Sequence, residues 1–237
     1  MGETIQITAD DGDTFEAYVA RPAAPTRRAV VVIQEIFGVN AHIRSVADAY
    51  AAQGFLAIAP ALFDRRKAGV ELGYDADGIK QGVEIAYGIG EEALTDIAAA
   101  LRWAREQTGA NPGVVGYCWG GSLAWLAATR LVPDLDAPAH AGALSGPAAV
   151  VSYYGRLVPE HADEAPRCPV MLHFGTRDAS IPLDRVEAFR AARPEATVHI
   201  YEASHGFNCD ARADFDAAAA ALATERTLAF FRSHMPD

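Results

Sequence analysis

Apolar and polar positions near the start of the chain follow a two-residue period. The segment ETIQITADDGDTFEAYVARP, residues 3–22, alternates on both sides of Asp11 and Gly12. Alternation of this kind around an Asp-Gly pair predicts an N-terminal β-hairpin with one buried face. The segment AVVVIQE, residues 29–35, is instead a continuous β-branched run. Such a run is typical of a strand that is covered on both faces, as in a parallel sheet.

After this run the period changes to that of a helix. Ile43, Val46, Ala47 and Tyr50 recur at helical spacing, and FLAIAP then predicts another short buried strand. A helix between two such strands makes the strands parallel neighbours. The same alternation continues to the C-terminus, with helices expected over 91–109, 119–130, 182–193 and 214–233, and strands over 112–118, 148–155, 169–175 and 196–202. The pattern predicts an α/β fold with a mostly parallel sheet, and one domain over 1–237.

Two segments interrupt this regular pattern. Residues 61–90 carry scattered glycines among charged residues. We expect a surface excursion there with a short helix, which forms a wall or lid of a site. Residues 132–147 form a connection rich in Pro, Ala and Gly, which we expect to cover the site or to mediate self-association, in a monomer or a homodimer.

Composition narrows the possible partners. The chain has a formal net charge of −11, with 51% hydrophobic and 22% charged residues. This charge argues against nucleic acid and against an acidic membrane surface, because both are bound through Lys and Arg. No apolar stretch reaches the length of a membrane span. Three cysteines without paired spacing fit free thiols in a reducing cytoplasm.

The segment VVGYCWGGSLAWLAA, residues 114–128, is the first candidate for chemistry. It places Cys118 between Gly116 and Gly120, which is the spacing of a G-x-S-x-G turn with cysteine in the serine position. A side chain at the centre of this strand-to-helix turn stands on strained backbone, and the helix N-terminus favours a reactive thiolate. A free cysteine can equally be a small buried hydrophobe, so the segment needs support from the rest of the chain.

That support comes from the residues that follow other predicted strands. Glu35 follows AVVVIQ at 29–34, Asp178 follows PVMLHFGTR, and His205 follows ATVHIYEAS. In open α/β sheets, functional residues lie beyond the carboxyl ends of the strands. The order Cys118, Asp178, His205 is the nucleophile, acid and histidine order of α/β-hydrolases. We therefore expect His205 to act as base and acid, with Asp178 fixing its tautomer.

A metal centre is the weaker alternative. His199 and His205 lie on and beyond the end of one predicted strand, but no cluster with zinc spacing accompanies them. The expectation from sequence is a site without metal or cofactor.

Four motifs give the chain a family resemblance: QEIFGVN at 34–40, GYCWGG at 116–121, GTRD at 175–178 and SHGF at 204–207. Together they resemble the dienelactone hydrolases, also called carboxymethylenebutenolidases, and the similarity extends over nearly the whole chain. The resemblance implies an α/β-hydrolase fold and a cofactor-free hydrolase of lactones or activated esters that forms an acyl-thioester.

The resemblance also implies roles for individual residues. Cys118 is the expected nucleophile, with His205 and Asp178 as its partners. Glu35 is expected beside the nucleophile, where it takes part in switching thiol to thiolate when substrate binds. The backbone N–H groups of Ile36 and Trp119 are the expected oxyanion donors.

The chain departs from the family pattern at the groups that bind the substrate carboxylate. The family has an arginine shortly after the histidine and another in the excursion, whereas here Cys209 stands at the first position. Arg212 and Lys80 are the candidates to replace them, although an arginine fork is not readily replaced by other charges. The remaining candidate substrate-binding residues are Phe37, Tyr153, Tyr154 and Phe207.

Two other functions stay open at this point. Loss of the two arginines favours a broader carboxylesterase or thioesterase that binds an uncharged acyl group. A non-catalytic redox sensor would use Cys118 as an oxidisable thiol of low pKa. The intact Asp178 and His205 argue against a sensor, which needs no general acid.

Overall fold

A single eight-stranded sheet organises the protein. The computed structural model describes residues 2–131 and 146–236. Within them the sheet order is β1-β2-β4-β3-β5-β6-β7-β8. The strands are β1 Glu3–Thr8, β2 Thr14–Ala20, β3 Ala29–Ile33, β4 Leu56–Pro60, β5 Gly113–Tyr117, β6 Val150–Tyr153, β7 Val170–Gly175 and β8 Thr197–Tyr201. Strands β3 to β8 run parallel to one another. Strand β2 of the antiparallel β1–β2 hairpin pairs with β4 in the antiparallel direction. The predicted N-terminal hairpin and mostly parallel sheet are confirmed.

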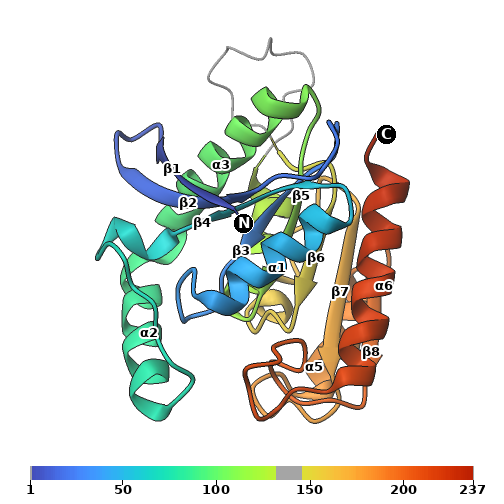
Figure 1. The fold of residues 1–237 in the computed structure, drawn as a ribbon. Coiled ribbons are helices and arrows are strands. Elements are labelled where there is room, and N and C mark those ends of the chain that lie inside the picture. Colours follow the sequence, from blue (N-terminus) through green and yellow to red (C-terminus); the bar gives the residue numbers. More distant parts are fainter. Residues whose placement is uncertain (1, 132–145, 237) are drawn as a thin grey trace.

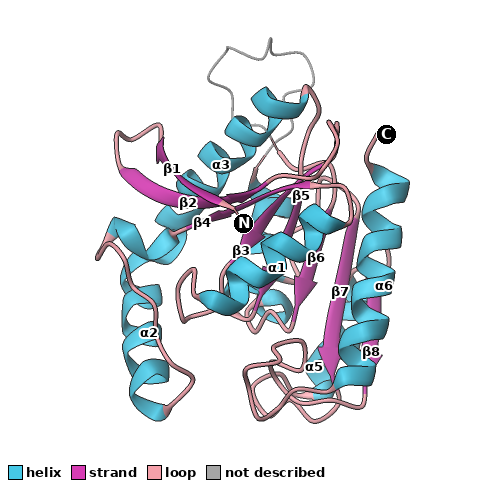
Figure 2. Ribbon diagram, viewed as in Figure 1, coloured by secondary structure: helices cyan, strands magenta, loops and turns pink. Residues whose placement is uncertain are grey.

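Helices cover both faces of this sheet (Figures 1 and 2). The helices are α1 Ala41–Ala52, α2 Ala76–Ile89, α3 Ala93–Thr108, α4 Trp119–Arg130, α5 Leu183–Ala192 and α6 Ala217–His234, with short 3-10 turns η1 Leu62–Arg65, η2 Gly90–Glu92 and η3 Val158–His161. Helices α1 and α6 adjoin through the rings of Tyr50 and Phe231, whose centroids are 6.3 Å apart. Helices α4 and α5 adjoin through Trp125 and Phe189, at 5.1 Å.

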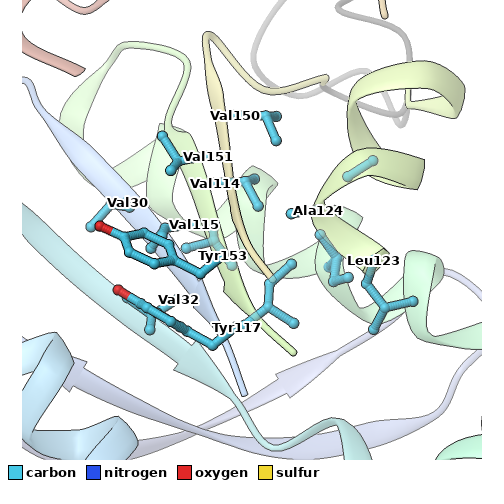
Figure 3. Close-up of a cluster of buried hydrophobic side chains, with 14 of the residues drawn as sticks. Val30, Val32, Val114, Val115, Tyr117, Leu123, Ala124, Val150, Val151 and Tyr153 are labelled. Atoms are coloured by element: carbon cyan, nitrogen blue, oxygen red, sulfur yellow. The ribbon is translucent and has the colours of Figure 1, made fainter. Parts of the chain in front are cut away.

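The core lies where the central strands meet these helices (Figure 3). Every residue of β3, β4, β5, β6 and β7 is buried, which explains their continuous apolar runs. Val31 pairs with Val114, and Tyr117 pairs with Tyr153. The rings of Tyr117 and Tyr153 stack at 4.8 Å. This packing fixes the ends of β3, β5 and β6, from which the candidate site is built.

The excursion at 61–90 is more regular than the sequence predicts. It contains η1 and the 14-residue helix α2, where only a short helix was expected. The Asp75 side chain accepts a hydrogen bond from Gly78 N and caps α2. The buried positions of α2 are Gly78, Gly82, Ala86 and Ile89, so two of its glycines, Gly78 and Gly82, lie on the buried face. Of the connection expected at 132–147, residues 132–145 lie outside the described residues.

In the described part of the chain, no helix combines the length and apolar character required to cross a membrane.

Candidate active site

The candidate residues gather at the carboxyl ends of the parallel strands. Glu35 follows β3, Cys118 follows β5, Tyr154 follows β6, and His205 follows β8. Asp178 lies three residues after the end of β7. Because these strands are neighbours in one sheet, their ends bring together residues that are far apart in the sequence.

Cys118 occupies a sharp turn between β5 and α4. Its backbone has φ 56° and ψ −115°, a strained conformation for a residue other than glycine. The turn is closed by small neighbours, because a Cβ at Gly116 would collide with the carbonyl of Gly120. Cys118 N donates to Tyr153 O at 3.0 Å, which ties the turn to β6. The cysteine is half-buried at the N-terminus of α4.

His205 and Asp178 form a close pair beside it. His205 Nδ1 lies 2.7 Å from Asp178 Oδ2, and the Asp178 side chain is buried. The other Asp178 oxygen accepts a hydrogen bond from Ser180 N at 2.8 Å. With both oxygens held, Asp178 orients the imidazole and leaves Nε2 for the sulfur of Cys118.

The charges around His205 favour its protonated form. Burial acts to lower the pKa of His205, but the Cys118 sulfur and the Asp178 carboxylate outweigh it and raise this pKa to about 10. A protonated imidazole beside the sulfur stabilises a thiolate by direct charge attraction. The arrangement therefore places a protonated imidazole next to the Cys118 sulfur.

Two backbone N–H groups, one in the loop after β3 and one at the start of α4, have no acceptor within the described residues. Among the described residues, neither Ile36 N nor Trp119 N donates a hydrogen bond to any acceptor. Trp119 is the first residue of α4, where an N–H has no acceptor within the helix. These are the two groups that the family resemblance implies as hydrogen-bond donors to an oxyanion.

Glu35 is buried, with 1% exposure, and its partner is Arg212. Arg212 Nη1 donates to Glu35 Oε1 at 3.3 Å, while Glu35 Oε2 is buried with no hydrogen-bond partner. Burial acts to lower the pKa of Arg212, but Glu35 and then Cys118 outweigh it and raise this pKa. Sequence spacing left the partner of Glu35 open, and the structure supplies it three residues beyond Cys209.

Arg212 reaches the site because the chain turns back after His205. Gly206 adopts φ 80°, and a Cβ there would collide with the Arg212 guanidinium. The guanidinium also lies 5.8 Å from the centre of the Phe37 ring. The loop after β8 thus folds Arg212 over the end of β3.

The other predicted binding residues separate into two groups. Tyr154 is buried with φ 40°, its ring lies 5.1 Å from that of His205, and its hydroxyl has no hydrogen-bond partner. Phe207 packs against Tyr154 at 5.3 Å. Tyr153, however, bonds Thr227 at 2.7 Å within the core. Lys80 is exposed on α2, and within the described residues it forms no ion pair.

Two further residues next to this site, Tyr74 and His42, were not singled out from sequence. Tyr74 packs on Phe37 with ring centroids 4.5 Å apart and accepts a hydrogen bond from Asn40 Nδ2 at 3.0 Å. His42, in the first turn of α1, is buried beside Asp210. They escape sequence reasoning because neither follows a strand directly. Leu72 N also donates to Phe37 O at 2.9 Å, so the excursion packs against the loop that follows β3.

Comparison with known proteins gives a consistent result. A model of the dienelactone hydrolase family matches residues 15–235. A carboxymethylenebutenolidase of Pseudomonas putida is 35% identical, covering 97% of this chain and 96% of its own. A candidate carboxymethylenebutenolidase of Synechocystis sp. is 34% identical, covering 92% of this chain and 91% of its own.

Solved structures are similar over the same extent. The crystal structure of a candidate dienelactone hydrolase from Klebsiella pneumoniae subsp. pneumoniae has a TM-score of 0.79 and 30% identity, covering 98% of this chain and 99% of that one. The dienelactone hydrolase-like promiscuous phosphotriesterase P91 from metagenomic libraries shares the fold, with a TM-score of 0.72, 21% identity and 99% of each chain covered. The family match over nearly the whole chain, together with these relatives, shows that the protein is an ester-bond hydrolase and belongs to the dienelactone hydrolase family.

Proposed function

We propose that the protein hydrolyses lactones or activated esters through a Cys118–His205–Asp178 triad and an acyl-thioester on Cys118. The observation that carries this proposal is the position of Cys118 on a strained turn within reach of an imidazole that Asp178 holds at 2.7 Å. The raised pKa of His205 supports a resting imidazolium, whose partner is the thiolate.

In the first half-reaction the Cys118 thiolate attacks the carbonyl carbon of the substrate, and the carbonyl oxygen becomes an oxyanion. The free N–H groups of Ile36 and Trp119 are the proposed donors to it. The C–O bond to the leaving oxygen then breaks, and His205 gives its Nε2 proton to that oxygen. In a lactone the leaving oxygen stays in the same molecule, now bound as a thioester.

In the second half-reaction neutral His205 takes a proton from water, and the resulting hydroxide attacks the thioester carbon. The C–S bond breaks, and the sulfur leaves as a thiolate beside the protonated imidazole. Asp178 keeps the ring in one orientation through both transfers. Each step uses groups of this chain and water, and none calls for a cofactor.

The choice of acyl group depends on Arg212. As a guanidinium within the site, it is the proposed partner of a substrate carboxylate, in the role for which the sequence offered Arg212 or Lys80. Its Nη1 is already bonded to Glu35, and this observation favours the second candidate, an esterase for uncharged acyl groups. A carboxylate-bearing substrate would have to share Arg212 with Glu35 or displace it.

The test compares initial rates on a carboxylate-bearing dienelactone and on a neutral aryl ester. We expect Cys118→Ala to abolish turnover and His205→Ala to lose most of it, with a burst of acyl-enzyme detectable by mass spectrometry in the native protein. Arg212→Met should slow only the dienelactone if Arg212 binds its carboxylate.

Each result separates the alternatives. Wild-type rates in Cys118→Ala would exclude the triad. Turnover of the neutral ester alone would support the esterase, and turnover of neither substrate would favour the thiol sensor. Cys168→Ala is the matched control, because this half-buried thiol lies before β7, at the opposite end of the strand from Asp178.

A further inference from the structure

Three side chains next to the candidate active site form a cluster that the proposed hydrolysis does not use as a unit. They are Glu35 from the loop after β3, His42 from α1 and Cys209 from the loop after β8. One ligand atom from each lies within 4.8 Å of the other two, and all three residues are buried. Carboxylate, imidazole and thiol are three of the donors that proteins use for zinc.

Two of these side chains have a buried polar atom that nothing in the protein satisfies. Glu35 Oε2 and His42 Nε2 are both buried with no hydrogen-bond partner, although their residues are only 1% and 8% exposed. Buried polar atoms are nearly always paired, so two unpaired atoms in one cluster indicate a missing partner. The partner must accept electron pairs from a carboxylate and from an imidazole nitrogen.

The second nitrogen of His42 is held as metal-binding histidines are usually held. His42 Nδ1 lies 3.1 Å from Asp210 Oδ1. A histidine that donates its Nδ1 proton to a carboxylate presents the lone pair of Nε2, and this support also raises its basicity as a ligand. Glu35 is held in a comparable way, since Oε1 binds Arg212 and Oε2 is left over.

We propose that Glu35, His42 and Cys209 form a binding site for a divalent transition-metal cation of the zinc type. The thiol selects a borderline or soft ion over magnesium or calcium. Three protein ligands leave a fourth position for water in tetrahedral coordination. Such coordination places ligand atoms about 3.3 to 3.8 Å apart, so the three side chains need to close by roughly 1 Å.

Metal binding changes the protonation and charge of the site. Binding releases the Cys209 thiol proton to solvent, and the thiolate then ligates the ion. The thiolate and the Glu35 carboxylate together balance the two positive charges of the ion. Arg212 keeps its contact with Glu35 Oε1 while Oε2 ligates the ion.

The location gives the site a regulatory effect, and this part rests on the proposed function. Glu35 would become a metal ligand next to Cys118 and would no longer be free to respond to substrate through Arg212. Zinc at this cluster should therefore inhibit hydrolysis without touching the Cys118 sulfur.

The test is a titration of the metal-free protein with Co²⁺ under reducing conditions, followed by competition with Zn²⁺. We expect a visible tetrahedral cobalt spectrum and a near-ultraviolet thiolate charge-transfer band, both removed by zinc. Cys209→Ser should lose the charge-transfer band, whereas Cys118→Ser and Cys168→Ser should keep it. A band that disappears in Cys118→Ser and persists in Cys209→Ser would place the ion on the nucleophile and overturn the proposal.

Two milder variants protect the test against misfolding. Asp210 has a side chain 71% exposed, so Asp210→Asn should fold normally and weaken cobalt binding about 10- to 100-fold by loss of support for His42. His42→Gln should weaken it further, with circular dichroism confirming the fold. No cobalt spectrum in the native protein, or unchanged affinity in Asp210→Asn, would overturn the site.

Activity measurements separate this inference from the proposed function. Zinc should inhibit ester hydrolysis by the native protein and by Cys168→Ser, and should have lost this effect in Cys209→Ser. Cobalt binding in a protein without hydrolase activity would leave the metal site standing and remove the proposed function. Hydrolase activity without cobalt binding would do the reverse.

Discussion

Two buried carboxylates in this protein differ in how completely they are paired. Asp96 on α3 has no exposure, and its two oxygens accept hydrogen bonds from Arg65 at 2.5 and 3.0 Å. Arg65 Nη1 also donates a hydrogen bond to Asp11 Oδ2 at 2.7 Å, and this contact ties the β-hairpin to η1 and α3. Glu35 is equally buried, but one oxygen is held at 3.3 Å and the other is unpaired.

This difference separates a structural charge from one that is available for chemistry. In a saturated pair such as Asp96–Arg65, both carboxylate oxygens already accept hydrogen bonds, so the pair serves to hold η1 and α3 together. Glu35 retains an open oxygen beside the proposed nucleophile and at the proposed metal site. Buried groups with unmet hydrogen-bonding capacity are costly, and they are retained where a ligand, a substrate or a reaction uses them.

The largest expected effect is on the saturated pair. Asp96→Ala leaves the Arg65 guanidinium largely buried without its main partner, and breaking a buried pair costs about 3–5 kcal/mol of stability. Urea unfolding should show this loss, while the activity per folded molecule stays at the native level. A loss below about 1 kcal/mol would mean that Arg65 relaxes onto Asp11, and the contrast with Glu35 would fail.

The second largest effect is expected at Glu35, where a substitution should reduce activity and leave stability nearly unchanged. Glu35→Gln keeps the shape and an acceptor for Arg212 but removes the charge near Cys118. We expect kcat/KM to fall about 10- to 100-fold, with a change in unfolding free energy within about 1 kcal/mol. Steady-state kinetics and urea unfolding on the same preparation measure both quantities. Native activity together with a large loss of stability would make Glu35 a structural charge like Asp96.

Glu164 sharpens the comparison as a carboxylate that is saturated but less deeply buried. Arg130, Thr129 and His161 all bond it, and the pKa of Glu164 is lowered to about 2, chiefly by Arg130. A carboxylate with a lowered folded pKa adds stability above its unfolded value, and this stability is lost as pH falls through the folded value. Thermal midpoints should therefore fall between pH 4.5 and 2 in the native protein.

Glu164→Gln should remove that part of the pH dependence. At neutral pH we expect a loss of about 1–2 kcal/mol, because partial exposure screens the pair. An identical acid profile in the variant would show that the stability is carried by other groups.

The smallest effect is expected at the surface. Arg66 and Glu92 form a 2.6 Å ion pair with side chains 40% and 53% exposed. Glu92→Gln should change the unfolding free energy by no more than about 0.5 kcal/mol, since exposed pairs contribute little. A loss of unfolding free energy as large as that in Glu164→Gln would mean that the contribution of these carboxylates to stability does not increase with their burial.

The sequence predicts the sheet and the candidate residues at its edge, because both depend on local patterns. Continuous apolar runs mark buried strands, and a polar residue directly after each run lies at the strand end, as Glu35 and Cys118 do. The β-hairpin was equally accessible from its alternation around Asp11 and Gly12. These features need no knowledge of how distant loops fold.

What the sequence misses depends on loop geometry. Arg212 reaches Glu35 only because the chain reverses over Gly206, and no periodicity encodes that reversal. Adjacent Tyr153 and Tyr154 look equivalent in the sequence, but one ends β6 in the core and the other turns toward His205. Helix α2 was underestimated because its glycines weaken helix propensity, although Gly78 and Gly82 pack on its buried face.

The order of the site groups along the chain also bears on the biosynthesis of the protein. Cys118 precedes Asp178 by 60 residues and His205 by 87, and β8, the strand that His205 follows, is the last of the described strands to leave the ribosome. Under the proposed mechanism, the cysteine has no imidazole beside it until β7 and β8 have joined the sheet. The emerging chain would then present no activated sulfur to cellular electrophiles before its fold is nearly complete.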